Sequence, residues 1–225
     1  MKNSILLILV CILLQSCNPP KKDLAKITFT EKYNTFFGDI PNEFDLSISA
    51  KTYTGYYESE SSEILNFNGV DLSDYRNEKG GFGTNNVRFA FTKDNHVLCE
   101  YVINLNTEKS IQKLINALKS KFGKAKFADK LDLLDDFPDA YIWQDKDIIY
   151  LLSGTTQSSA WLMVFNINYK ELYDNRISGP FMYYYDYLEY LKENKKTDKQ
   201  ISYYQYAKIL EKEGSNYKID NYVKP

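Results

Sequence analysis

Two stretches in the middle of the chain alternate apolar and polar positions, a pattern typical of half-buried strands. The first covers residues 86–92 and the second covers residues 97–105, with Asp94 and Asn95 forming a turn between them. The second stretch places Val97, Cys99, Tyr101, Ile103 and Leu105 on one face, and His96, Glu100 and Asn104 on the other. The sequence therefore predicts a β-hairpin with one apolar and one polar face.

A helical period follows this hairpin directly. Residues 107–122 place Ile111, Leu114, Ile115, Leu118 and Phe122 on one face, after a cap at Asn106 or Thr107 and before Gly123. The other predicted strands cover residues 52–57, 63–67, 140–143, 148–152 and 160–167. The last of these is apolar at almost every position, as expected of an inner strand. The β-β-α-β-β-β order predicts an α+β fold, in which an antiparallel sheet carries the amphipathic helix.

The pattern becomes helical again after Pro180 and predicts two C-terminal helices that pack on the sheet. The first covers residues 181–191, and the second begins at Thr197, where Gln200 can complete a capping box. Two stripes compete for the inward face of the second helix: Ile201, Tyr204 and Lys208, or Tyr203, Ala207 and Leu210. We expect residues 26–225 to form a single α+β domain.

The first 17 residues contain the parts of a targeting segment in their usual order: a positive charge, an apolar run and a cleavage site. Lys2 precedes an unbroken apolar run over residues 5–14, about half of the ~20 residues that a membrane-spanning helix needs. The run ends in Leu14, Gln15, Ser16 and Cys17. This ending resembles the lipobox of bacterial lipoproteins, with a leucine three residues before the cut, a small residue just before it and a cysteine just after it.

The resemblance implies a signal peptide over residues 1–16, cleavage between Ser16 and Cys17, and lipidation of the Cys17 thiol. Two or three acyl chains would hold the protein firmly at a membrane. Residues 17–25 would then be the lipidated cysteine and a tether, which two prolines keep extended. We therefore expect a lipid-anchored protein of the bacterial cell envelope that faces the periplasm. With Asp23 as its only acid, the tether gives no support for surface display.

The net charge and the number of cysteines argue against a nucleic-acid partner and against an intramolecular disulfide. The net charge is −2 with no long block of like charge, which argues against a nucleic-acid partner. Cys11 would leave with the signal peptide and Cys17 would carry the lipid, so Cys99 would have no partner for an intramolecular disulfide. The domain is expected to be stable through burial alone.

No motif in the sequence indicates catalysis, so we expect no catalytic residue, no metal site and no cofactor. His96 is the only histidine and is predicted to be an exposed turn residue. Cys99 lies on the predicted apolar face, where it would be a core residue rather than an activated thiolate. The glycines at 80, 81 and 83 lack the lysine of a phosphate-binding loop and precede a strand.

Five aspartates crowd into residues 129–139, namely Asp129, Asp132, Asp135, Asp136 and Asp139. They could bind Ca²⁺ or act as paired acids. Their spacing fits no Ca²⁺ loop, and apolar residues interrupt them. The favoured interpretation is a solvated acidic loop.

Tyrosine is unusually abundant, with 20 Tyr beside 13 Phe. Surplus tyrosine can form a stacking platform or an interaction surface, but an AT-rich coding sequence would also produce this composition. Tyr183, Tyr184, Tyr185 and Tyr187 sample all sides of one predicted helix. We expect Tyr184 and Tyr185 to pack, which leaves Tyr183 and Tyr187 as the candidate binding residues.

Three functions fit these observations. The first, which we favour, is a non-catalytic envelope lipoprotein whose α+β domain binds another protein or a glycan. The second is an immunity or inhibitor lipoprotein that neutralises a toxin or a wall-degrading enzyme. In this function the acidic loop of residues 129–139 would cover a basic active site. The third is an envelope hydrolase built on carboxylates.

The lipid anchor makes a direct prediction for the wild-type chain and the Cys17→Ser variant, expressed in a diderm bacterium. Wild type should begin at Cys17, carry the added mass of its lipid and partition with membranes. The variant should lose the lipid and the membrane association together, because the thiol is the attachment point. Intact mass and membrane fractionation measure both, and a wild-type chain that is soluble and free of lipid would refute the anchor.

Overall fold

The computed structural model describes residues 21–74, 83–130, 137–156 and 158–224. Several residues named above lie outside these ranges: Ser16, Cys17, Gly80, Gly81, Asp132, Asp135 and Asp136. In the described ranges, none of the helices combines the length and the apolar character needed to cross a bilayer.

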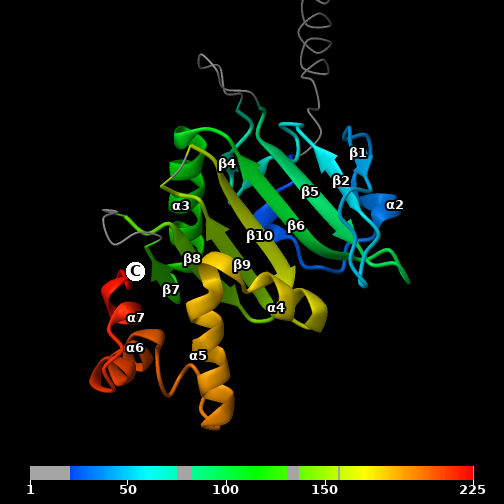
Figure 1. Cartoon of the computed structure of the whole chain (residues 1–225). Helices are drawn as coiled ribbons and strands as arrows, with labels where there is room; N and C mark the ends of the chain where they lie inside the picture. Colours follow the sequence, from blue (N-terminus) through cyan, green and yellow to red (C-terminus); the bar gives the residue numbers. More distant parts are fainter. Residues whose placement is uncertain (1–20, 75–82, 131–136, 157, 225) are drawn as a thin grey trace, which may run out of the picture.

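The fold is an α+β arrangement built on a large antiparallel sheet (Figure 1). The eight strands lie in the order β1-β2-β5-β6-β10-β9-β8-β7. Their bounds are β1 Glu43–Asp45, β2 Tyr56–Ser59, β5 Asn86–Phe91, β6 Leu98–Leu105, β7 Phe127–Asp129, β8 Ala140–Asp145, β9 Ile148–Ser153 and β10 Ala160–Asn166. A separate two-stranded sheet pairs β3 Asn66–Phe67 with β4 Val70–Asp71. The predicted hairpin β5–β6 and the inner position of β10 are confirmed.

Helices cover both faces of the sheet, and the described residues form an apolar cluster on each face. The first face carries η1 Leu24–Lys26, α2 Tyr33–Phe36 and α3 Glu108–Phe122. The second face carries α4 Lys170–Arg176, η2 Gly179–Phe181, α5 Met182–Glu193 and α6 Tyr203–Lys212. The short α7 Tyr217–Asp220 follows α6. Helix α3 matches its prediction: the Thr107 side chain caps it by accepting from Ser110 N, and Gly123 ends it at a φ of 73°.

The chain joins the core earlier than the tether boundary at residue 25 predicted. Leu24 and Ala25 are buried in the first cluster, since the Asp23 side chain accepts a hydrogen bond from Ala25 N and starts η1. Lys22 N also donates to Glu63 O at 2.7 Å. The described chain is therefore fixed to the domain from its first residues.

The cap of the second C-terminal helix lies at Ser202, five residues after its predicted position at Thr197. Gln200 does accept from Thr197 N, but this bond closes only a turn. The complete capping box is formed by Ser202 and Gln205, so α6 starts at Tyr203. The inward stripe is the second of the two alternatives: Tyr203 and Ala207 are buried, whereas the ring of Tyr204 is 44% exposed.

A bulge at Cys99 moves this residue off its predicted face of strand β6, whereas Tyr101, Ile103 and Leu105 share one face as predicted. Ala90 pairs with Glu100 and Phe91 pairs with Leu98, so Cys99 is the extra residue. Cys99 consequently joins the second cluster, whereas Tyr101 belongs to the first. Its thiol donates to Ala90 O at 3.3 Å, and burial raises the pKa of this thiol. The expectation that Cys99 is a core residue is confirmed, on the opposite face from the one expected.

Glu100, predicted on a polar face, is completely buried beneath α4. Arg176 compensates its charge through a bidentate contact, with Nε donating to Oε1 at 2.8 Å and Nη2 donating to Oε2 at 2.9 Å. The Tyr56 hydroxyl donates to Oε2 at 2.7 Å, and Tyr53 accepts from Arg176 Nη2. Glu171 adds a second connection between α4 and the loop before β2 by accepting from Thr52 N at 2.8 Å. This network holds α4 on the sheet.

Replacement of Glu100 by Gln should lower the free energy of unfolding by about 3 kcal/mol, because a partly buried Arg176 loses its compensating charge. Urea denaturation measures the loss. The control is Glu58→Gln, which removes the carboxylate of a more exposed ion pair with Arg88 on neighbouring strands. It should cost less than about 1 kcal/mol, and equal losses in the two variants would contradict the assigned role of Glu100.

Candidate functional site

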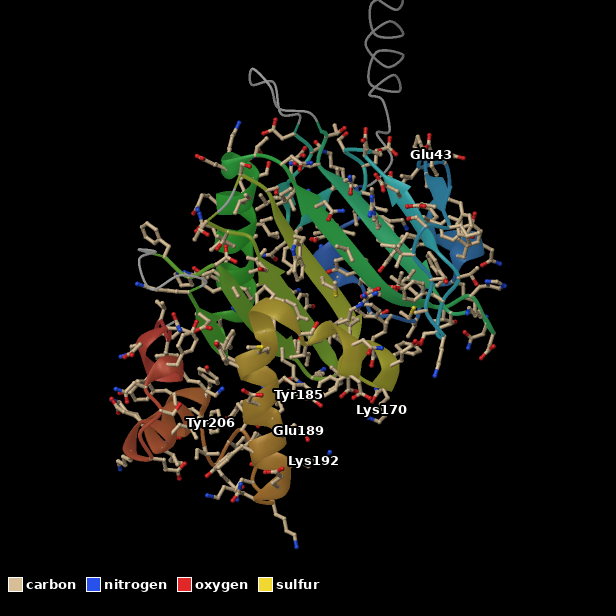
Figure 2. The ribbon with its side chains drawn as sticks, viewed as in Figure 1. Glu43, Lys170, Tyr185, Glu189, Lys192 and Tyr206 are labelled. Atoms are coloured by element: carbon tan, nitrogen blue, oxygen red, sulfur yellow. The ribbon has the colours of Figure 1, made fainter. Side chains whose placement is uncertain are left out.

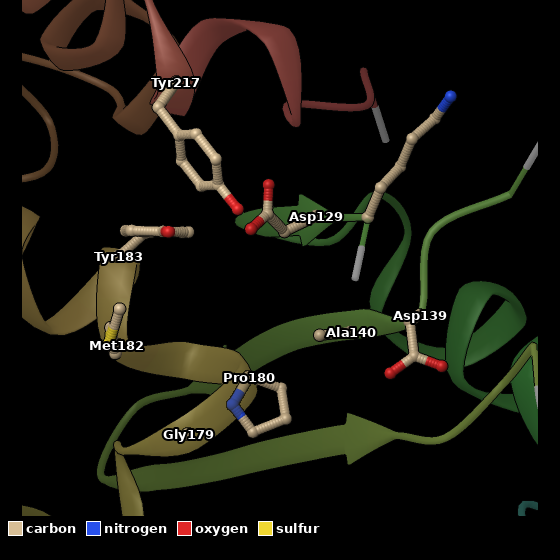
Figure 3. Close-up of a pocket in the computed structure, with 9 residues that line it drawn as sticks. Asp129, Asp139, Ala140, Gly179, Pro180, Met182, Tyr183 and Tyr217 are labelled. Carbon is tan, nitrogen blue, oxygen red and sulfur yellow. The ribbon is translucent and has the colours of Figure 1, made fainter. Parts of the chain in front are cut away.

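A cleft of about 320 Å³ opens where the edge of the sheet meets α5 and α7 (Figure 3). Asp129 at the end of β7 and Ala140 at the start of β8 form one side. Pro180 and Met182 from η2 and α5 form an apolar wall. Tyr183 and Tyr217 complete the lining with their rings.

The C-terminal segment positions this cleft by covering the edge strand β7. Asp129 forms an isolated antiparallel bridge with Tyr222. Lys130 N donates to Asn221 O, and Val223 N donates to Ala128 O, both at 3.1 Å. These bonds satisfy backbone groups that an edge strand would leave open, and they hold α7 beside the cleft.

Asp129 is the unusual residue of the cleft. Its side chain is only 3% exposed, and its Oδ1 atom has no hydrogen-bond partner. Burial raises the pKa of the carboxyl to about 7, and the positive charge of Lys218 opposes this shift only in part. Near neutral pH this carboxyl can therefore exist in either protonation state.

Asp139 is also buried, but its carboxylate is fully used for structure. It accepts four hydrogen bonds, from the Ser153 hydroxyl, Gly154 N, Thr156 N and the Thr156 hydroxyl. The cleft thus combines one structural carboxylate with one carboxyl oxygen that lacks a partner.

The rings of Tyr183 and Tyr217 lie edge to face, with centroids 5.4 Å apart. Burial and a hydrogen bond with Tyr217 raise the pKa of Tyr183 to about 12, so its hydroxyl stays protonated. Lys218 Nζ lies 4.4 Å from the Tyr183 ring centroid and 2.5 Å from an Asp186 carboxylate oxygen. In Figure 3 the hydroxyl end of Tyr217 points toward the carboxyl of Asp129.

The two candidate tyrosines have different surroundings. Tyr183 lines the cleft. Tyr187, expected at the surface, is 2% exposed: its ring packs against Tyr203, and its hydroxyl donates to Ile201 O at 2.6 Å. Tyr184 is buried as predicted, whereas Tyr185 is 36% exposed. Tyr187 was misplaced because α6 covers its side of α5, which the pattern of one helix cannot reveal.

The prediction that residues 129–139 form a solvated acidic loop is wrong for the two aspartates of this segment that the structure describes. Asp129 and Asp139 are both buried. The β7 strand of only three residues gave no period-2 signal, and neither Tyr217 nor Asn221 stood out in the sequence. His96 lies in an exposed turn, as predicted, at a φ of 53°. Within the part of the chain that the structure describes, no three His, Cys, Asp or Glu side chains form a group suited to a metal ion.

The chain matches no protein-family model, no curated protein and no solved structure. The cleft is therefore interpreted from its own geometry and chemistry.

The buried carboxyl makes stability depend on pH. The native state keeps the Asp129 proton up to about pH 7, whereas an unfolded aspartate releases it near pH 4. Stability from this group is complete below pH 4 and falls as the pH rises to 7. Between pH 5 and 8, wild type should lose about 3 kcal/mol of unfolding free energy relative to Asp129→Asn, which cannot ionise. Urea denaturation at both pH values measures the difference, and parallel pH profiles would disprove it.

Proposed function

We propose that the chain is a lipid-anchored protein of the bacterial envelope whose α+β domain binds another protein or a glycan without catalysing a reaction. The cleft beside Asp129 is the binding site in this proposal. The supporting observation is a buried carboxyl oxygen that lacks a partner, next to tyrosine rings and an apolar wall. Apolar walls with a few convergent polar groups are the usual lining of a ligand site.

The chemistry of the cleft favours binding over hydrolysis. Carboxylate-based glycoside hydrolysis uses two acids that are free to act on the substrate. Of the two acids in the cleft lining, Asp139 accepts four hydrogen bonds that hold the turn after β9. Among the described acids that line the cleft, Asp129 alone remains available to a ligand.

The proposed anchor would keep this domain close to the bilayer. Cys17 is four residues before Lys21, a separation that chain geometry limits to about 14 Å. Lys21 is itself fixed to the domain by an ion pair of 2.8 Å with Asp71. The partner is therefore expected to be a component of the envelope.

The proposal is tested by measuring which envelope components the lipidated full chain, solubilised in detergent, retains. Wild type should retain a specific protein or polysaccharide, and the Tyr183→Ala, Tyr217→Ala double variant should retain at least tenfold less, because it loses the aromatic lining. Tyr185→Ala is the matched control. Tyr185 is also a tyrosine of α5, but it lines a separate hollow with Lys170 of α4 (Figure 2).

Equal retention by wild type and the double variant would exclude the cleft as the binding site. No retention by any form would refute the binding function. If the retained partner is a toxin or a wall-degrading enzyme that loses activity on binding, the inhibitor function replaces the general one.

A further inference from the structure

Unpartnered buried polar atoms gather at one junction of the molecule. In the described residues, three buried side-chain atoms have no hydrogen-bond partner: Asp129 Oδ1, Tyr203 Oη and Asn221 Oδ1. The bridge between Asp129 and Tyr222 brings Asn221 to the same edge of the sheet, and the ring centroids of Tyr203 and Tyr222 lie 6.0 Å apart. Such atoms are costly to leave unpaired. Of the three residues, Asp129 lines the cleft, so its unpartnered oxygen points to a polar group that binds there.

When Asp129 is ionised, the group that pairs with it must donate hydrogen bonds. A carboxylate oxygen and an amide oxygen only accept, and a tyrosine hydroxyl can accept as well. A primary ammonium carries three N–H donors and no acceptor, and its positive charge would balance ionised Asp129. Its chemistry therefore fits the unpartnered oxygen and the negative charge of Asp129, which lines the cleft.

The aromatic lining suits the same group. The contact of Lys218 with the Tyr183 ring shows an ammonium against one ring of the cleft. Lys218 is itself paired with Asp186, so its positive charge is compensated. The ring of Tyr217 is 52% exposed and can pack against an incoming alkyl chain.

We propose that the cleft binds a primary alkylammonium group, with Asp129 as its counter-ion and Tyr217 against its alkyl chain. The inference rests on the proposed binding function of this cleft. The ammonium can belong to a free amine or to a lysine side chain of a protein, which share this chemistry.

Binding of this group must depend on pH. The charged and titratable groups near Asp129 come from several elements: Lys130 after β7, Asp139 before β8, Tyr183 and Asp186 from α5, Tyr203 from α6, and Tyr217 and Lys218 from α7. The pKa of Asp129 is raised to about 7, so the carboxyl is mostly neutral at pH 6 and mostly ionised at pH 8. Affinity for an ammonium should therefore fall about tenfold from pH 8 to pH 6.

Calorimetric titration of the detergent-solubilised full chain with 1-pentylamine, which is protonated at both pH values, tests the proposal. Pentylamine should bind at pH 8 and bind about tenfold more weakly at pH 6. Neutral 1-hexanol should bind at least tenfold more weakly than the amine at pH 8. The peptide acetyl-Gly-Lys-Gly-amide forms a second arm: its binding would assign the site to a protein side chain, and its exclusion would assign the site to free amines.

Asp129→Asn should abolish binding of the amine, and Asp174→Asn should preserve it, because Asp174 belongs to an exposed ion pair with Lys170 on α4. The wild-type pH dependence keeps the proposal testable if the Asp129 variant does not fold. Equal affinity for amine and alcohol, or no binding of either the amine or the peptide at pH 8, would overturn the proposal and leave buried water as the partner of the three atoms.

The two proposals fail separately. Binding of amine without retention of any envelope component would refute the proposed function and keep the ammonium site. Retention of an envelope partner without binding of amine or lysine peptide would refute the ammonium site and keep the proposed function.

Discussion

The contact between Glu100 and Arg176 is the interaction on which the second face of the molecule depends. A carboxylate buried under a helix is tolerated only with a compensating charge and hydrogen bonds, and Arg176, Tyr53 and Tyr56 supply both. Because Arg176 ends α4, the contact fixes where the chain turns into η2 and α5. The apolar wall of the cleft belongs to η2 and α5, so its position follows from that of α4.

Asp129 and Asp139 show how two nearby acids acquire opposite roles. The two residues are connected through the backbone, where Asp139 N donates to Asp129 O at 2.9 Å. Donors from the turn after β9 surround Asp139, and its carboxylate is saturated. Asp129 instead faces tyrosine rings and the C-terminal segment, and its Oδ1 has no donor. Residue type alone cannot distinguish these cases, because the difference lies in elements distant in sequence.

The local pattern of apolar and polar residues was sufficient to predict most of the fold. Period-2 alternation located β5 and β6, and the caps at Thr107 and Gly123 delimited α3. The pattern failed where contacts between elements distant in sequence determine the local structure. The bulge at Cys99 moved this residue to the opposite face of β6, and α4 was not predicted. Of the cleft, only Tyr183 was anticipated as a binding residue, because Tyr217 and the buried state of Asp129 depend on how the C-terminal segment crosses the edge of the sheet.

The central claim is that Asp129 is a buried carboxyl available to a ligand, and its own titration tests this most directly. The measurement is a ¹³C NMR pH titration of the side-chain carboxyl carbons in wild type, with the resonance assigned by its absence in Asp129→Asn. We expect a midpoint near pH 7, because burial raises the pKa of this carboxyl. A midpoint near pH 4, typical of a solvated aspartate, would contradict the burial of this group and the role of the cleft built on it.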